Sequence, residues 1–211
     1  MKGDPTTAPT PRTRQYRSGD ERRSEIVEAT IAIIAEQGLR EVKTAELARR
    51  VGVSEATIFR HFGSLEEVLI AAVTREAAVL RDRISAFKGS GTPWERAEQL
   101  VLALIDFFAE TGGGPIVIVT GQVVRISPEI RDVAMTTLGL ARRRLLGFVS
   151  EAVATSGAPA SPEHVTDLLI AVIQSNALRW IMSDRQWPMH EAAEQMLALL
   201  RCTVVPRGDN A

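Results

Sequence analysis

The chain has 211 residues, of which 45% are hydrophobic and 24% charged, with a formal net charge of −1 and a single cysteine. This composition is typical of a soluble globular protein whose core needs no metal or disulfide support. It excludes an internal disulfide and, because no apolar run reaches about 18 residues, a transmembrane helix, so we expect a cytoplasmic protein.

Residues 1–17 are rich in Pro, Thr and Arg and lack hydrophobic periodicity, which predicts a disordered basic tail rather than a secretory signal. The first 61 residues hold 11 Lys and Arg against 9 Asp and Glu, whereas the remainder holds 14 against 17. A basic end on an acidic body is typical of a chain that meets a polyanion, although solubility alone also explains the pattern.

Helix start and stop signals then follow one another. Ser18 begins a capping-box pattern that opens a helix ending at Gly38. Two short helices are predicted, one near residues 45–51 and one at residues 55–61 that Ser54 caps. Another capping-box pattern at Ser64 opens a long helix that ends near residue 87.

The second half of the chain repeats these signals. Pro93, Pro128 and Pro162 each follow a Ser or Thr and open helices that end near residues 112, 155 and 184. Pro188 opens the last helix, which ends near residue 204. No alternation of strands and helices is visible, so the sequence predicts an all-α fold.

One segment is ambiguous. Residues 116–119 are Ile-Val-Ile-Val, and their β-branched side chains favour a strand by propensity alone. No partner strand is visible, and a lone strand leaves its backbone groups unpaired. We therefore expect a buried helix that opens at Pro115, preceded at residues 112–114 by either a mobile lid or a simple turn.

The strongest functional signal spans residues 44–62, TAELARRVGVSEATIFRHF. Leu47 marks the apolar face of a short helix, Gly52 permits a sharp turn, and Val53 fills the angle to the next helix. Ile58 and Phe62, four residues apart, anchor that second helix. This pattern is typical of a helix-turn-helix, whose second helix fits the major groove of DNA.

From about residue 20 to residue 69 the chain resembles the DNA-binding domain of the tetracycline-repressor (TetR) family. The resemblance is carried by the helix ending at residues 33–38, by Leu47-Ala48, by Gly52-Val53-Ser54 and by the aromatic-x-His-Phe signature at residues 59–62. It implies a three-helix N-terminal helix-turn-helix domain and a C-terminal helical domain for ligand binding and dimerisation. We therefore expect a tail at residues 1–17, a helix-turn-helix domain at 18–64, a connecting helix at 65–88, a ligand-binding and dimerisation domain at 89–205, and a tail at 206–211.

Three positions depart from the family pattern. Phe59 replaces the usual Tyr and Leu65 replaces a frequent Lys, so two phosphate contacts are missing. Lys43 replaces the usual Thr, which leaves the helix cap to Thr44 and frees Lys43 to meet a phosphate. Each lost contact lowers affinity and flattens its salt dependence, and the Arg-rich tail is a candidate to compensate in the minor groove.

The match assigns nine residues to the DNA surface, of which Thr57 and Arg60 are the candidates for base readout. The alternative is that Phe59 packs inward and Glu55 only supports the helix N-terminus. The assigned residues are Lys43, Thr44, Ser54, Glu55, Ala56, Thr57, Phe59, Arg60 and His61.

The last two helices are the candidate dimer interface, because the helix after Pro162 is apolar nearly all round. The resemblance implies the same homodimer, which would place two reading heads on a palindromic operator. The alternative is that these helices only close the core of one chain. The candidate interface residues are Val165, Leu168, Leu169, Val172, Ile173, Ala193, Met196, Leu197 and Leu200.

A pocket for a small, mainly apolar effector is a further expectation, with Gln122, Arg125, Gln174 and Asn176 as candidate polar groups. Each candidate lining residue has the alternative of being ordinary core. The lining candidates are Trp94, Ile105, Phe107, Phe108, Ile116, Val119, Gln122, Val123, Met135, Leu138, Leu146, Asn176 and Trp180.

The sequence favours a repressor whose affinity for double-stranded DNA is changed by a ligand, in a direction that the sequence leaves open. A DNA-binding protein without a ligand, acting structurally or through a protein partner, is the alternative. No phosphate loop, nucleophile elbow or metal-ligand spacing is present, so we expect neither an enzyme nor a cofactor nor a bound metal.

Overall fold

The computed structural model describes residues 18–112 and 127–204, and every regular element within these ranges is a helix. The elements are α1 (Gly19–Gln37), a 3₁₀ turn η1 (Leu39–Glu41), α2 (Thr44–Val51), α3 (Glu55–His61), α4 (Leu65–Ala86), α5 (Pro93–Glu110), α7 (Pro128–Ser156), α8 (Pro162–Met182) and α9 (Met189–Val204). The predicted all-α fold is confirmed. The helix predicted from Pro115 and the tails predicted at 1–17 and 206–211 lie outside the described residues.

Local capping explains why the helices begin where the sequence predicts. The Ser18 side chain accepts from the backbone N–H of Glu21, whose carboxylate accepts from the N–H of Ser18 in return. The same reciprocal pair forms between Thr92 and Glu95 at the start of α5. These bonds satisfy N–H groups that have no partner inside the helix.

One predicted cap is wrong, and one predicted capping box forms only in part. The N-cap of α2 is Lys43, whose side chain makes no capping hydrogen bond, and Thr44 is the first helical residue. At the start of α4, Ser64 caps as predicted, but the Glu67 carboxylate accepts from the N–H of Gly63 instead of closing a capping box on Ser64.

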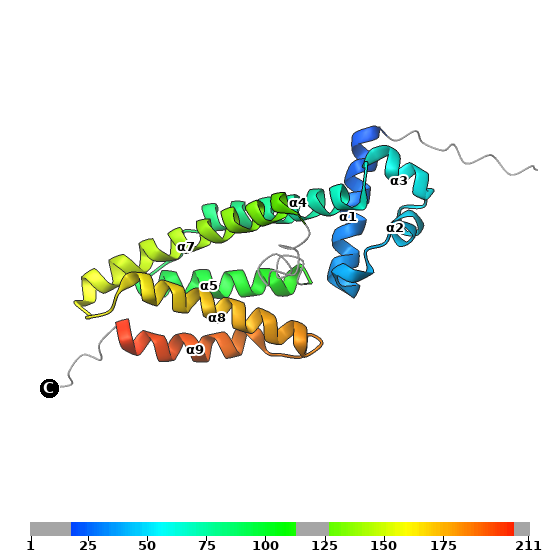
Figure 1. Ribbon diagram of the computed structural model, residues 1–211. Coiled ribbons are helices and arrows are strands. Elements are labelled where there is room, and N and C mark those ends of the chain that lie inside the picture. The colour runs from blue at the N-terminus through cyan, green and yellow to red at the C-terminus, as the bar shows by residue number, and fades with distance from the viewer. Residues whose placement is uncertain (1–17, 113–126, 205–211) are drawn as a thin grey trace, which may run out of the picture.

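The helices pack into a head and a body (Figure 1). The head holds α1, α2 and α3, and its buried cluster includes Ile33, Leu47 and Ile58. The body holds α5, α7, α8 and α9 around a second cluster that includes Trp94 and Leu145. Within residues 18–112 and 127–204, no helix combines the length and hydropathy of a bilayer span.

Helix α4 belongs to both parts. Its first half, with Val68 and Ala72, is buried in the head, whereas Leu80 and Ile84 are buried in the body. Its main packing partner is α7, and Ile130 from the first turn of α7 reaches into the head cluster. A rigid helix shared by two cores transmits a displacement of one to the other.

Candidate functional site

The turn between α2 and α3 has the geometry that a helix-turn-helix needs. Gly52 adopts φ 72° and ψ 39°, a left-handed conformation that is unfavourable for residues with a Cβ. Its N–H and that of Val53 both donate to the carbonyl of Ala48, the second at 2.9 Å. The chain therefore reverses sharply and delivers α3 at a steep angle to α2.

One side of α3 is fixed in the head and the other is free. Ile58 and Phe62 are each 1% exposed, so the predicted core anchors are confirmed. Phe59 is 47% exposed and does not pack into the head core. Arg60 is exposed as well, and it makes no ion pair with any residue of the described ranges. The free side thus offers an aromatic ring and an unneutralised guanidinium.

The first turn of α3 is ordered by Ser54. Its hydroxyl accepts from the N–H of Thr57 at 3.2 Å and lies 3.0 Å from the Thr57 hydroxyl. The Glu55 and Ala56 side chains next to it are exposed. Thr57 is half-buried, so its side chain is held in one orientation while part of it remains accessible.

The charges around the turn are mixed. Lys43 is exposed and pairs with Glu41 at 3.0 Å, a contact that a phosphate would have to replace. Burial and the neighbouring guanidiniums of Arg60, Arg22 and Arg23 hold the pKa of His61 below its usual range. At neutral pH His61 is therefore uncharged in the free protein.

A chain of ion pairs braces α2 against α1. Arg50 contacts Glu36 of α1 at 2.5 Å and Glu46 of its own helix at 3.0 Å. Hydrogen bonds from Arg49 and Arg50 lower the pKa of Glu46 to about 2, so this carboxylate stays charged over the physiological range. Arg49, the second cation of this group, is largely exposed and was not a sequence candidate.

The candidate dimer residues fall into two groups. Most are buried in the core of the single chain and have no side-chain area left for a second copy, namely Val165, Leu169, Val172, Ile173, Ala193 and Leu197. Leu168 is 50% exposed, and Met196 and Leu200 are partly buried.

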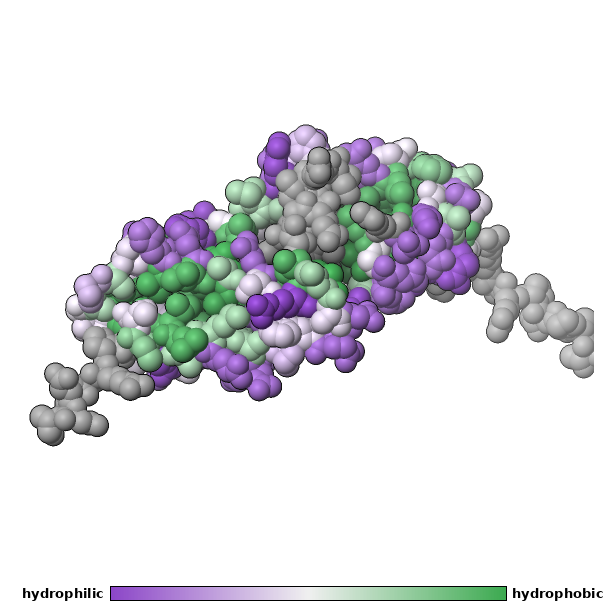
Figure 2. Space-filling model, turned by 60° about the horizontal axis from the view of Figure 1, so that its bottom comes forward, coloured by the Kyte–Doolittle hydropathy of each residue, from purple (hydrophilic) through white to green (hydrophobic). Residues whose placement is uncertain are grey.

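The outer face of α8 and α9 carries other exposed apolar residues that the sequence analysis missed. Leu178 and Met182 continue from Leu168 along one side of α8, and Leu199 on α9 is 74% exposed. Figure 2 shows hydrophobic side chains gathering on the face that these two helices form. An apolar face of this kind is typical of an interaction site.

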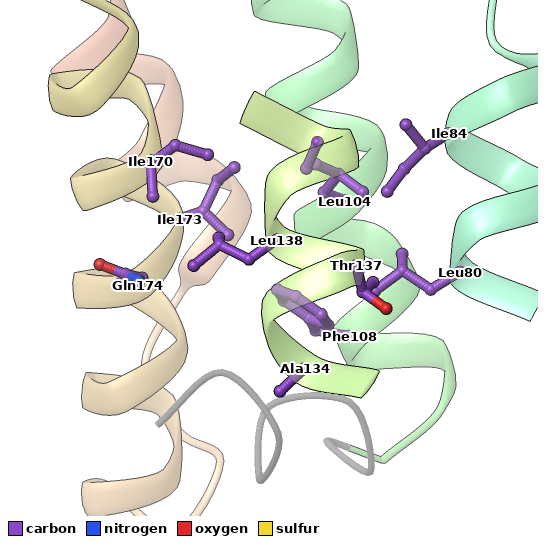
Figure 3. Close-up of a pocket in the computed structure, with 11 residues that line it drawn as sticks. Leu80, Ile84, Leu104, Phe108, Ala134, Thr137, Leu138, Ile170, Ile173 and Gln174 are labelled. Carbon is purple, nitrogen blue, oxygen red and sulfur yellow. The ribbon is translucent and has the colours of Figure 1, made fainter. Parts of the chain in front are cut away.

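An apolar pocket lies inside the body, between α4, α5, α7 and α8 (Figure 3). Its volume is about 40 Å³, enough for little more than water. The Gln174 side chain makes no hydrogen bond within the described ranges, whereas the Thr137 hydroxyl donates to the carbonyl of Val133 and accepts from Arg81. The lining residues are Leu80, Ile84, Leu104, Phe108, Ala134, Thr137, Leu138, Ala141, Ile170, Ile173 and Gln174.

Few of the candidate pocket residues line this space. Phe108 and Leu138 do, as does the candidate polar group Gln174. Trp94 and Asn176 instead make hydrogen bonds elsewhere in the body. The Trp94 indole N–H donates to Glu98, and the Asn176 side-chain oxygen accepts from the Trp187 indole N–H. Met135 is 62% exposed and points away from the core. The structure places Ile105, Phe107, Leu146 and Trp180 outside the lining, while Ile116, Val119, Gln122, Val123 and Arg125 lie outside the described residues.

In the comparison with known proteins, the clearest sequence match covers the head. Residues 26–72 match the model of the family described as bacterial regulatory proteins, tetR family. The chain is 40% identical over 81 residues to the HTH-type transcriptional regulator BetI of Rhizobium meliloti, a match that covers 38% of this chain and 40% of that protein. It is 26% identical over 187 residues to the nucleoid occlusion factor SlmA of Vibrio vulnificus, covering 87% of this chain and 95% of that one.

Solved structures share the whole fold. A transcriptional regulator from Saccharomonospora viridis, solved with choline, superposes with a TM-score of 0.73 at 19% identity, covering 89% of this chain and all of that one. FadR from Bacillus subtilis, solved with stearoyl-CoA, gives 0.67 at 18% identity, with coverages of 84% and 96%. The arrangement of head and body described above is therefore shared with known transcriptional regulators.

Proposed function

Because this chain belongs to the TetR family of DNA-binding transcriptional regulators, we propose that it is a repressor released from its operator by a small, mainly apolar ligand. In this proposal, residues 18–64 read DNA, residues 65–88 form the helix that connects the two domains, and residues 89–205 bind the ligand and dimerise. The observation that carries the proposal is the body pocket. Its lining includes Leu80 and Ile84 of α4, the helix whose first half is part of the head core.

The small size of the pocket supplies the mechanism. Ligand sites for drug-sized molecules measure about 300–1,000 Å³, several times the space available here. A ligand therefore enters only if α4, α5, α7 and α8 move apart. The state with separated helices is the one that the ligand prefers, and binding shifts the population toward it. Movement of α4 then changes the position of α3 on DNA.

A second contact joins the body to the head near the end of α5. A Cβ on Gly112, which has φ +63°, would lie 2.8 Å from the Cβ of Ala35 in α1. Beside it, a cleft of about 270 Å³ lies between the end of α1 and the end of α8. The chain at Gly112, two residues after α5, thus lies close to Ala35 of α1, which gives head and body a second point of coupling in this proposal.

This contact gives a testable prediction. We expect Gly112→Ala to displace α1 from the body and to change the operator affinity of the ligand-free protein. Ala in the left-handed region costs about 1–2 kcal/mol, and the overlap with Ala35 adds to it. In a double-mutant cycle, Ala35→Gly should recover the overlap part only, measured as operator affinity and thermal unfolding. Strict additivity of the two changes would contradict a direct contact.

The ligand is tested with two probes, stearoyl-CoA and choline, which are the ligands named for the two structural neighbours. The lining offers aliphatic side chains, the Phe108 ring, the Thr137 hydroxyl and the Gln174 amide, but neither a carboxylate nor a cage of several aromatic rings to hold a quaternary ammonium. We expect stearoyl-CoA, and not choline, to raise the melting temperature and to lower operator affinity by about 5–150-fold.

A matched pair of variants links this response to the pocket. Leu138 lines the pocket and Leu102 does not, although both are partly buried leucines of the body. We expect Leu138→Trp to fill the space and abolish the response while operator binding persists, and Leu102→Trp to respond like the natural chain. Equal responses in both variants would place the ligand elsewhere.

The second candidate function is DNA binding without a small-molecule ligand, through structure or a protein partner. Its support is the similarity to a nucleoid occlusion factor over 187 residues, which extends through the body and not only the head. Under this alternative, neither probe releases DNA, and Leu138→Trp changes nothing but stability.

A further inference from the structure

The recognition helix is short and needs support at its end. Helix α3 has seven residues, and an isolated helix of that length is unstable in water. Its first turn is capped by Ser54, and the N–H of Phe62 satisfies the carbonyl of Ile58. The carbonyls that follow have no partner within the helix. What holds this end decides where Arg60, in the last turn, points.

A residue from another helix occupies this end. Arg23 of α1 donates a hydrogen bond from Nη1 to the carbonyl of His61, 38 residues away in the sequence. Its guanidinium carbon also lies 4.0 Å from the centroid of the Phe62 ring, the anchor that follows α3. A cation at a helix C-terminus interacts favourably with the carbonyl dipoles there, and the aromatic face adds to the attraction.

We propose that Arg23 is a positioning residue for DNA reading, which fixes the C-terminal end of α3 and with it the direction of Arg60. The proposal rests on DNA reading by α3, and it adds a residue that lies outside the helix-turn-helix segment. Arg23 acts through α3 and not through a phosphate of its own.

The neighbouring arginine provides a matched control. Arg22 is half-buried and pairs with Glu25 at 2.6 Å, one turn along its own helix. Its guanidinium makes no hydrogen bond or ion pair with α3 in the described ranges, although its charge, like that of Arg23, lowers the pKa of His61. Because Arg22 and Arg23 carry the same charge at adjacent positions, a general electrostatic effect weakens DNA binding equally in both variants, whereas a positioning effect is confined to Arg23.

The test uses the full chain and two duplexes, one selected by the natural protein from a random-sequence pool and one scrambled from it. For Arg23→Met we expect roughly a tenfold loss of affinity for the selected duplex, as befits a lost charged hydrogen bond and cation–π contact. Affinity for the scrambled duplex should not change. Arg23→Lys should retain most of the affinity, because an ammonium can also donate to the carbonyl. Arg22→Met should match the natural chain.

Salt dependence separates positioning from direct contact. Each lost phosphate contact reduces the slope of log affinity against log salt by about 0.9, so a dimer would lose about twice that. We expect no change of slope for Arg23→Met. A reduced slope, a loss of affinity for both duplexes, or equal effects in Arg22→Met and Arg23→Met would overturn the proposal, as would an unchanged affinity for the selected duplex.

Arg23 is exposed, so Arg23→Met leaves no cavity in the head core, and the contact that it loses is the one over the Phe62 ring. If the natural chain selects no duplex at all, the proposed function fails instead of this inference.

Discussion

We expect Leu199→Glu to convert the protein into a folded monomer and to lower its operator affinity by about 10²–10⁴-fold, the range gained when two binding modules are linked. Leu199 is 74% exposed in the single chain, so a carboxylate there costs the fold little. In a dimer that uses the outer face of α8 and α9, the same carboxylate would be buried without a partner, which is strongly unfavourable.

The control is Met135→Glu, which introduces the same charge at another exposed apolar residue, 62% exposed on α7. Sedimentation should show a monomer for Leu199→Glu and a dimer for Met135→Glu, with titration of the operator duplex alongside. A Leu199→Glu protein that remains dimeric would move the interface to another face. A monomer with full operator affinity would contradict the pairing of two heads.

The second large effect is expected at the recognition helix. Arg60→Ala removes the exposed guanidinium of α3, and a good bidentate contact to a base is worth about 1–3 kcal/mol of discrimination. Two heads double this value to about 2–6 kcal/mol, so operator affinity should fall by roughly one and a half to four orders of magnitude. Thr57→Ala should cost less, because its hydroxyl is already engaged with Ser54.

Lys43→Ala serves as the comparison, since Lys43 is a candidate phosphate contact. Arg60→Ala should reduce the ratio of operator to scrambled-duplex affinity, whereas Lys43→Ala should weaken both duplexes and reduce the salt slope. Binding isotherms at several salt concentrations measure both quantities. If Arg60→Ala and Thr57→Ala bind the operator like the natural chain, other residues read the bases.

The helix boundaries were accessible from the sequence because capping is local. Ser18, Ser54 and Thr92 each cap a helix through a backbone N–H three residues away, so a short window contains the whole interaction. The turn at Gly52 is local in the same sense. The contact between Arg23 and the end of α3 spans 38 residues and leaves no local signal.

The candidate dimer face was harder to predict from the sequence, because the apolar character of a side chain does not show whether its own chain or a second copy covers it. Leu168 and Leu169 are adjacent and identical in type, yet one is 50% exposed and the other fully buried. In a helix that is apolar on most sides, periodicity does not separate the intramolecular face from the outer one. The positions of α5, α7 and α9 around α8 decide this.

The pocket was predicted from large side chains, and this is why most candidates missed it. Large side chains fill space, as the buried Trp94 and Phe107 do in the body core. Space remains where side chains are small or stop short, as with Ala134 and Ala141. Which small residues face one another depends on how α4, α7 and α8 pack, and no single stretch of sequence contains that information.

The most direct measurement is a footprint of the purified protein on the DNA that flanks its own gene, at low salt. Two α3 helices carried by one dimer should protect a single region of two inverted half-sites, with centres one helical turn, about 34–36 Å, or a multiple of it apart. Uniform or absent protection would mean that α3 is not reading a palindromic site.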